Sequence, residues 1–412
     1  MYEEERDIID ALREGKAPEQ STGYMLIGRK EEMDEFKRLL KDVKRGKAVT
    51  KFINAQFGMG KSLLLRRVEE IAIENNFVVS YIDLPKRAAD LPFNKFEIVY
   101  TKIVQGLRSK SGRSFKEIID AWLLNLKNRA RDELDNPLRS EDPIIIKLMN
   151  ESLEPVREHS NAFTVVLESY YLGLKTGNDE KANSAIAWLE GDPNMPANKR
   201  KEIGVKGTIT KEESFNFLKA LTIFIKSIGY LGLVVLIDEA ENIMNLTTGN
   251  LREGAYGNIK ALYDNEHGLE NIIFIFAGTP QLFQEGERKG IGSYDALYER
   301  IKDVLHSPYK NIREPVIELE GLKRDELREV SKKIIEMHTL AYDWDPRSRM
   351  NPVLEDILNY YEERAGLSGG KVIPRDFIRA FVDVLDTIEQ HPDITEENIL
   401  GLFEEKESEW EL

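Results

Sequence analysis

Two periods of hydrophobic spacing run along the chain, and they predict different elements. Helical spacing indicates a short N-terminal helix, with Ile8, Ile9, Ala11 and Leu12 on one side, and a second helix after Gly28. Short apolar runs indicate strands at residues 49–56, 77–84, 232–238, 271–278 and 316–319. Helices are predicted between them at residues 62–75 and 212–228. Strands that alternate with helices are typical of a parallel α/β sheet.

The strand pattern disappears between Pro85 and Thr210. Helical spacing at 115–126 and 144–153, interrupted by Gly, Pro and Asn clusters, indicates a large helical insertion in the α/β domain. After Gly321 we predict only helices, at residues 323–341, 351–364, 374–389 and from Thr395, with residues 404–412 as a frayed end. The expected domains are an N-terminal helical segment 1–23, an α/β domain 24–320 with the insertion at 85–210, and a C-terminal helical lid 321–412.

Composition narrows the chemistry that the chain can perform. Its 412 residues are too many for one typical domain, and its 41% hydrophobic content is sufficient for a buried core. The absence of Cys excludes disulfides, thiolate metal sites and Cys nucleophiles. The N-terminus does not resemble a secretory signal, and no apolar run approaches the roughly 20 residues that span a bilayer. We therefore expect a cytoplasmic protein without membrane contact.

Charge weighs against one class of partner. A formal net charge of −15 argues against a globally basic nucleic-acid coat, although a local basic strip could still hold DNA. The basic clusters at 127–131 and 199–201 are such candidates, but solvated helix faces are the favoured interpretation. The five His residues are scattered without the spacing of metal ligands, so Mg²⁺ is the only metal that we expect.

A glycine-rich segment between a predicted strand and a predicted helix has the spacing of a phosphate-binding loop. Backbone N–H groups of such a loop and the helix N-terminus converge on phosphate oxygens, while Lys61 adds a positive charge and Ser62 places its hydroxyl on Mg²⁺. Ala55 replaces the usual first Gly and should fit if its φ is negative. The candidate nucleotide-binding residues are Gln56, Phe57, Gly58, Met59, Gly60, Lys61, Ser62 and Leu63.

Two adjacent acids end the apolar run Leu233–Ile237. Because strand carboxyl ends form the ligand-binding edge of parallel sheets, Asp238 is a candidate Mg²⁺ ligand through water. Glu239 is then the candidate base that orients and polarises the attacking water. The alternative is that both acids only cap the following helix.

Three further residues are candidates for contacts to the transferred phosphate. Thr279 closes the next strand, where it could contact the γ-phosphate or the attacking water, although a Thr before Pro280 could also only start a turn. Arg300 has the place of an arginine finger that reaches a neighbouring subunit. Arg375 begins a C-terminal helix, from which a lid arginine could reach the phosphates, since guanidinium stabilises charge on phosphoryl groups. Exposed, ion-paired helix positions would explain both arginines equally well.

Most of the chain, from about residue 7 to 386, resembles the BrxC/BrxD-type P-loop ATPases of bacteriophage-exclusion (BREX) defence systems, in particular the smaller BrxD-like members. The specificity comes from linked minor motifs rather than from the phosphate loop, which many families share. These motifs are residues 11–15 with Pro18, 27–29 with Glu32, 57–62, 229–233, 238–241, 277–280, 293–300 and 374–377.

The resemblance implies an AAA+/ASCE-like P-loop NTPase fold related to the initiator and origin-recognition group, with ATP and Mg²⁺ as cofactors. It also implies that Gly28 and Arg29 contact the adenine side, and that Lys61, Ser62, Asp238, Glu239, Thr279, Arg300 and Arg375 have the roles given above. Work on double-stranded DNA, with a helicase or other defence subunits, and homo-oligomerisation are the implied partnerships.

Three functions follow from these features, and the sequence leaves them open. The leading interpretation is an ATPase that hydrolyses slowly until a neighbouring subunit or DNA completes its site. The second is a nucleotide-gated scaffold in which ATP binding controls assembly and turnover is incidental. The third is an initiator-like DNA-binding protein, for which the region after Arg375 is short.

Overall fold

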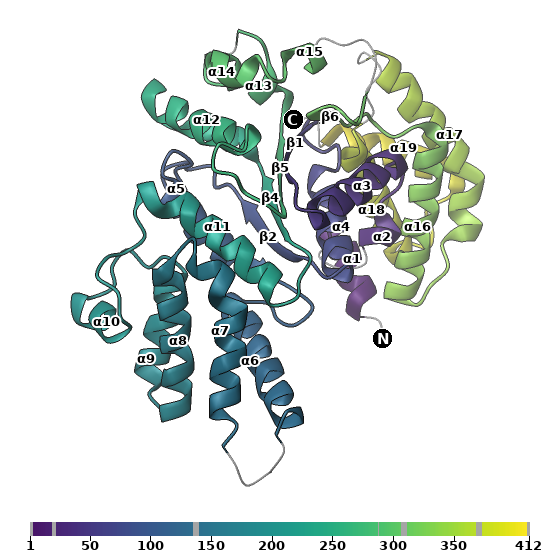
Figure 1. Ribbon diagram of the computed structural model, residues 1–412. Coiled ribbons are helices and arrows are strands. Elements are labelled where there is room, and N and C mark those ends of the chain that lie inside the picture. Colours follow the sequence, from purple (N-terminus) through teal and green to yellow (C-terminus); the bar gives the residue numbers. More distant parts are fainter. Residues whose placement is uncertain are drawn as a thin grey trace. The chain divides into compact units, whose positions relative to one another are not determined.

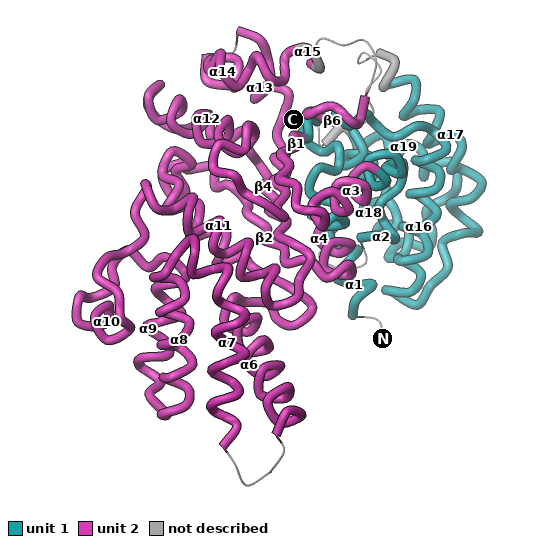
Figure 2. The backbone as a smooth tube through the Cα atoms, viewed as in Figure 1, with its two compact units in different colours: residues 1–34, 53–68, 317–412 teal, residues 35–52, 69–316 magenta. Residues whose placement is uncertain are grey.

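The computed structural model describes residues 3–18, 22–134, 140–286, 288–305, 311–367 and 373–409. These residues form a six-stranded sheet and helices that belong to two compact units (Figures 1 and 2). Unit 1 comprises residues 1–34, 53–68 and 317–412, and unit 2 comprises residues 35–52 and 69–316. This grouping reflects packing, and the expected domain boundaries at residues 23 and 320 stay a prediction.

The strand order in the sheet is β3-β2-β4-β5-β1-β6. In unit 2, β4 lies parallel between β2 and β5, with Ser80 opposite Val235 and Val235 opposite Phe274. All of β4 and β5 is buried, which explains their unbroken apolar runs. The strands are β1 (Ala48–Asn54), β2 (Val78–Asp83), β3 (Leu107–Arg108), β4 (Leu233–Asp238), β5 (Ile272–Gly278) and β6 (Val316–Glu318).

One strand contradicts the sequence prediction. We expected no strand between residues 85 and 210, but β3 pairs antiparallel with β2 through Val79 and Arg108. A two-residue strand has no hydrophobic period, so it leaves no pattern to detect. Elsewhere the fold class is confirmed: the sheet is mostly parallel, a long helical segment separates β2 from β4, and the region after β6 is helical.

The helical insertion shares its hydrophobic core with the sheet of unit 2. Helices α6 to α9 lie side by side, and α7 packs against α11, which itself packs against α5 (Figure 1). Aromatic rings join these helices: Phe224 of α11 lies edge-on to Trp122 at 5.2 Å and packs against Phe163 at 5.8 Å. The helices are α5 (Phe96–Gln105), α6 (Phe115–Asp132), α7 (Asp142–Arg157), α8 (Asn161–Thr176), α9 (Asp179–Leu189), α10 (Ala197–Glu202) and α11 (Lys211–Ser227).

Shorter helices follow β4 and β5 in unit 2. A 3₁₀-helix, η1 (Ala240–Asn245), begins directly after the two acids and leads to α12 (Gly249–Tyr263). After β5 the chain forms α13 (Pro280–Phe283), the 3₁₀-helix η2 (Ile291–Ser293), α14 (Asp295–Tyr298) and α15 (Lys302–Leu305). The helix α3 (Lys30–Lys44), which follows Gly28 as predicted, joins the two units in sequence and buries apolar side chains, among them Met33 and Phe36.

Unit 1 has a separate core made by the N-terminal and C-terminal helices. Helix α1 packs against α16 and α18, and α19 packs against α17 and α18. Ile8, Ile9 and Leu12 of α1 are buried, as the helical spacing predicted, while Ala11 is half-buried. The helices are α1 (Glu3–Arg13), α2 (Thr22–Met25), α4 (Lys61–Glu74), α16 (Arg324–Tyr342), α17 (Arg347–Leu367), α18 (Pro374–Gln390) and α19 (Glu396–Glu409), of which α4 continues into unit 2.

The predicted frayed end is wrong for residues 404–409. Helix α19 continues to Glu409, and the buried carboxylate of Glu407 forms an ion pair with the guanidinium of Arg364 at 2.9 Å. The acidic composition suggested a solvated tail, but one acid is neutralised by a basic residue of α17. Residues 410–412 lie outside the described residues.

Candidate functional site

The phosphate-loop candidate follows β1 and ends where α4 begins at Lys61. Gly58 and Gly60 have φ angles of +83° and +87°, which glycine adopts without strain. Among the described non-glycine residues, positive φ occurs at Asn76, Glu239, Asn265, Asn271 and Asp343, so Ala55 keeps a negative φ. Ala55 therefore fits the place of the usual first Gly of the loop, as expected for a residue with a negative φ.

Lys61 folds back onto the loop from which it extends. Its Nζ donates to the carbonyl oxygens of Ala55 at 2.9 Å and Gln56 at 3.1 Å, and the residue is buried. Ser62 and Leu63 are half-buried, and Leu63 packs against the unit 1 core. The loop thus has a shaped backbone, a buried ammonium group and a helix N-terminus, which are the groups that suit a polyphosphate.

Arg375 lies directly on the loop within unit 1. Its backbone N–H donates to the carbonyl of Gly58 at 3.2 Å, and its guanidinium lies 4.5 Å from the ring centre of Phe57. The Phe57 side chain is 64% exposed, which is unusual for a large apolar residue. Burial and the nearby charge of Arg379 lower the pKa of Arg375, and its Nε makes no hydrogen bond to the described residues.

Gly28 and Arg29 also belong to unit 1, and Arg29 contacts the loop. The buried Arg29 guanidinium donates to the carbonyl oxygens of Met59 at 3.2 Å and Glu320 at 2.6 Å, and its pKa is lowered by burial. Gly28 has a φ of +70°, and a side chain there would meet the carboxyl group of Glu326. The structure thus places both candidates beside the loop or the start of α16, and their adenine contact stays a prediction.

The two acids at the end of β4 have different surroundings in unit 2. Asp238 is buried; its Oδ2 accepts from the Tyr81 hydroxyl at 2.8 Å, and its Oδ1 accepts from the backbone N–H of Glu239 at 2.9 Å. Glu239 is half-buried and has φ +52° and ψ +40°. Its Oε2 accepts from Asn242 Nδ2 at 3.0 Å. A Glu in this left-handed region is strained, and such strain is concentrated at functional sites.

Sequence reasoning missed the partners of these acids. Tyr81 lies two residues before the end of β2, on the strand next to β4, and Asn242 lies one turn after Glu239. The strand pairing that brings Tyr81 to Asp238 has no local signal in the sequence. The spacing of Glu239 and Asn242 could have suggested a contact, because side chains three residues apart share a face of a short helix.

Thr279 and Arg300 lie elsewhere in unit 2. Thr279 follows β5 directly, is half-buried and donates its backbone N–H to Glu241 Oε2 at 3.3 Å. Arg300 forms a two-pronged ion pair with Asp264, with N–O distances of 2.6 and 2.5 Å, and also donates to the carbonyl of Ala296. Thr279 is thus next to the segment that carries the two acids, whereas Arg300 is engaged by its own chain.

No helix among the described residues is both long enough and apolar enough to cross a membrane. No curated protein matches the chain. Two solved structures are similar over 93% of its length: the ORC2 protein of Aeropyrum pernix, with 14% identity, a TM-score of 0.44 and 69% of that chain covered, and a Walker-type ATPase of Pyrococcus abyssi, with 12% identity, a TM-score of 0.40 and 72% of that chain covered. The family described as BREX system ATP-binding protein BrxC/D matches residues 2–403, so this chain belongs to that family.

Proposed function

We propose that this chain is an ATPase of a phage-defence (BREX-type) complex, which couples hydrolysis of Mg·ATP to assembly or remodelling on DNA. The observation that carries the proposal is the conformation of the 55–62 loop, where two glycines at positive φ precede a buried lysine at a helix start. Membership of an ATP-binding family supports ATP as the ligand of this loop.

The roles of the residues follow from their chemistry. Lys61 and the loop N–H groups would bind phosphate oxygens, and Ser62 and Asp238 would hold Mg²⁺, which neutralises charge on the phosphates. Glu239 would orient a water molecule for in-line attack, Thr279 would assist it, and Arg375 would stabilise the transferred charge.

The experiment that tests this proposal measures ATP turnover against protein concentration, with and without duplex DNA. Glu239→Gln should abolish turnover while the chain still retains ATP, because the amide keeps the shape but not the basicity. Glu253→Gln removes the same charge from the exposed face of α12 and is the matched control. Turnover that survives in Glu239→Gln would overturn the proposed chemistry.

One observation favours a second function, the nucleotide-gated scaffold. Arg300 is held by Asp264 of its own chain, so an arginine finger in trans would require this ion pair to open. Tight ATP binding without turnover, at every protein concentration and with DNA present, would support the scaffold. The Arg300→Ala variant separates the two functions. Turnover should fall in this variant only if Arg300 acts as an arginine finger.

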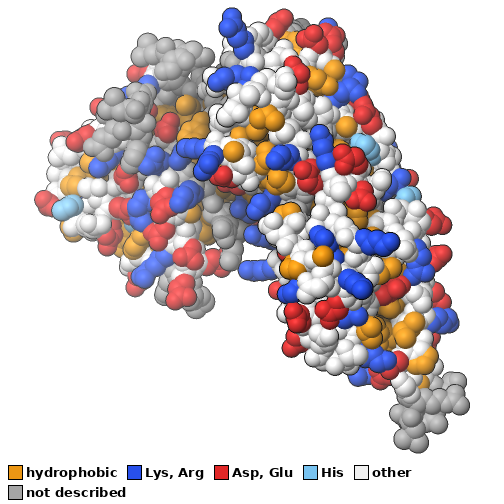
Figure 3. Space-filling model, turned by 90° about the vertical axis from the view of Figure 1, so that its left-hand side faces the viewer, with side chains coloured by type: hydrophobic (Ala, Val, Ile, Leu, Met, Phe, Trp, Pro, Cys, Tyr) orange, Lys and Arg blue, Asp and Glu red, His pale blue; other side chains and the backbone are white. Residues whose placement is uncertain are grey.

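Charge distribution suggests which part of the chain would meet DNA or a partner. Residues 85–210 contain 20 Lys and Arg and 18 Asp and Glu, which gives a net charge of +2. Because the whole chain has a net charge of −15, the remaining residues together carry −17. Figure 3 shows basic, acidic and apolar side chains interspersed on the face of the insertion in view. Salt-dependent binding to duplex DNA, weakened by substitutions in the insertion, would support DNA as the partner.

A further inference from the structure

Three asparagine side chains hold the segment that leads from β2 into the helical insertion. Asn242 Nδ2 donates to the carbonyl of Leu84 at 2.7 Å, and Asn245 Nδ2 donates to the carbonyl of Lys86 at 3.0 Å. Asn258 Nδ2, on α12, donates to the carbonyl of Phe93 at 2.8 Å. The bond to Leu84 is buried, where a backbone carbonyl requires such a donor, and the three bonds together hold the path of the segment.

Two of these asparagines are also connected to Glu239. Asn242 Nδ2 donates to Glu239 Oε2 at 3.0 Å, and Asn242 Oδ1 accepts from Asn245 Nδ2 at 3.1 Å. The amide of Asn242 therefore divides its two hydrogens between the carbonyl of Leu84 and the carboxylate of Glu239. Asn258 has no part in this chain of hydrogen bonds among the contacts described.

The backbone of Glu239 needs this support. Its left-handed conformation is one that only Asn, Asp and Gly adopt readily. Among the described residues with a positive φ, Glu239 is the one that is not Asn, Asp or Gly. The backbone N–H of Asn242 donates to the carbonyl of Glu239 at 2.9 Å, so backbone and side chain of Asn242 both hold Glu239. Asn242 is itself buried, which restricts its amide to this arrangement.

We propose that Asn242 is a positioning residue that couples the segment Leu84–Lys86, which leads from β2 into the insertion, to the carboxylate of Glu239. A partner that displaces this segment would pull the Asn242 amide and change the orientation of Glu239. The insertion would thus regulate hydrolysis through two asparagines rather than through contact with the nucleotide. This inference rests on the proposed function, in which Glu239 orients the attacking water.

The full chain with Asn242→Ala tests the coupling. We expect kcat for ATP hydrolysis to fall, on the order of 10²-fold, because a Glu239 carboxylate that is displaced by about 1 Å no longer orients the attacking water for in-line attack. The KM and the affinity for ATP should stay within about twofold, since Asn242 is not a phosphate ligand. Asn242→Asp should lower kcat at least as far, because its carboxylate faces that of Glu239.

Asn258→Ala is the matched control. It removes an amide-to-carbonyl bond from Phe93, which lies between β2 and α5 but outside Leu84–Lys86, and leaves the bonds to Glu239 in place, so its kcat should equal that of the wild type. Asn245→Ala, which keeps Asn242 and is the milder variant if Asn242→Ala does not fold, should lower kcat by a smaller factor. Thermal unfolding of each variant separates loss of fold from loss of positioning.

The outcomes distinguish this inference from the proposed function. If Glu239→Gln abolishes turnover but Asn242→Ala and Asn245→Ala keep the wild-type kcat, the coupling is refuted and the ATPase stands. Equal losses of kcat in Asn242→Ala and Asn258→Ala would also refute it, because they indicate only a structural role for the segment. If Glu239→Gln has no effect, the proposed chemistry fails first.

Discussion

At the scale of single residues, glycine at position 58 satisfies two separate requirements. Its φ of +83° is unfavourable for L-residues, and a Cβ there would lie 2.6 Å from Cγ2 of Ile373. Ile373 directly precedes α18, whose Arg375 donates to the carbonyl of Gly58. The sequence suggested only the first requirement, because the closeness of residue 373 depends on tertiary packing.

Gly58→Ala is therefore expected to weaken ATP binding at least tenfold, because the loop must move to admit the methyl group. Titration with a fluorescent ATP analogue measures the affinity. Gly46→Ala is the control: Gly46 has a φ of +103° but nothing within 4 Å of its Cβ position. It should lose about 1–2 kcal/mol of stability without a change in affinity. Equal affinities for both variants would contradict the argument.

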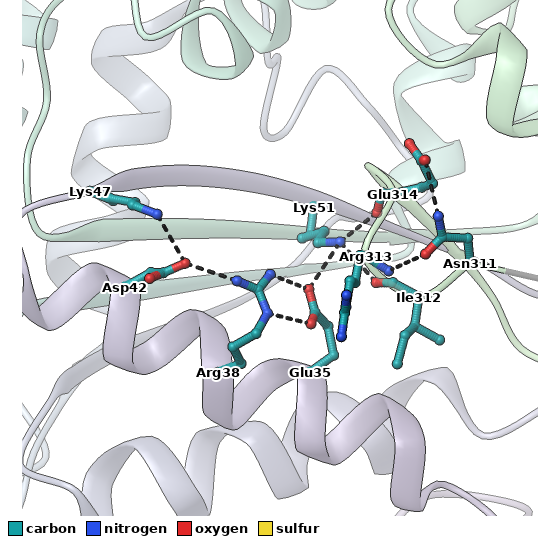
Figure 4. Close-up of polar contacts among 9 residues, drawn as sticks. All are labelled: Glu35, Arg38, Asp42, Lys47, Lys51, Asn311, Ile312, Arg313 and Glu314. Atoms are coloured by element: carbon teal, nitrogen blue, oxygen red, sulfur yellow. Dashed lines mark hydrogen bonds and ion pairs between the residues drawn. The ribbon is translucent and has the colours of Figure 1, made fainter.

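At the scale of elements, a buried charge fixes β1 against its neighbours in unit 2. Lys51 lies in β1, and its Nζ contacts Glu35 of α3 at 3.4 Å and donates to the carbonyls of Ile312, at 3.0 Å, and Glu314 (Figure 4). Burial lowers the pKa of Lys51, while Glu35 opposes the shift. Both side chains are almost inaccessible, and Lys51 depends on Glu35 for its counter-charge, whereas the Glu35 carboxylate also accepts two bonds from Arg38 at 2.7 Å.

Lys51→Met should destabilise the protein by about 2–4 kcal/mol, since it leaves two carbonyl groups without a donor and removes one of the two cations that pair with the buried Glu35, Arg38 being the other. Chemical denaturation monitored by circular dichroism measures the change. Lys47→Met, which removes an exposed ammonium group 3.2 Å from Asp42, should change stability by less than about 0.5 kcal/mol. If the two variants were equally stable, the buried pair would contribute nothing to the anchoring of β1.

A second polar network joins α1 to the C-terminal helices of unit 1. Asp386 of α18 accepts from Arg13 of α1 at 2.7 Å and from His338 Nε2 at 3.0 Å. Trp344 Nε1 donates to His338 Nδ1 at 2.8 Å, so the His338 proton resides on Nε2. Burial would raise the pKa of Asp386, but the bonds from His338 and Arg13 outweigh it and lower the pKa.

Because the pKa of Asp386 is lower in the folded chain, its charge stabilises the fold above the unfolded value near 3.8, and this contribution is lost as pH falls further. Asp386→Asn should therefore cost about 1.5–3 kcal/mol at pH 7, and the difference from the wild type should shrink below about pH 4. Thermal unfolding across pH measures both. A difference that stays constant down to pH 3 would contradict this assignment.

These elements show how far sequence reasoning extends. Apolar periodicity predicted α3, α16, α18, β4 and β5 closely, because each buries one face or a whole strand. It did not predict that Lys51, within an apolar strand, would pair with Glu35, or that Asn242 would contact Glu239. Such contacts depend on tertiary packing and on side-chain direction, which hydrophobic spacing does not encode.

At the scale of the whole molecule, Arg300 is the residue that we expect to reach a neighbouring subunit as an arginine finger. A surface ion pair is worth up to about 1 kcal/mol, or roughly fivefold in population, so opening the Arg300–Asp264 pair would cost little. Its two-pronged geometry nevertheless keeps the guanidinium oriented within the chain. An arginine finger would thus be released when a neighbouring subunit offers it a more negative partner.

Asp264→Asn should raise ATP turnover per chain by up to about fivefold at concentrations at which assembly is only partial, because it frees Arg300 for a neighbouring subunit. Turnover measured over a range of protein concentrations tests this, and Lys260→Met, which removes the other cation that pairs with Asp264 at 2.9 Å, is the control. If Asp264→Asn matched the wild type at every concentration while Arg300→Ala stayed inactive, the action of Arg300 in trans would be disproved.

Unit 1, which contains the 55–62 loop, is assembled from three separate stretches of sequence. The loop is synthesised before the residues that cover Gly58 and stack on Phe57, which come more than 300 positions later. On the ribosome, unit 2 can therefore begin to pack while the loop still lacks its neighbours, since contacts distant in sequence form late. ATP-binding competence would then arise only after residues 373–375 have been synthesised, which would protect a nascent chain from premature nucleotide loading.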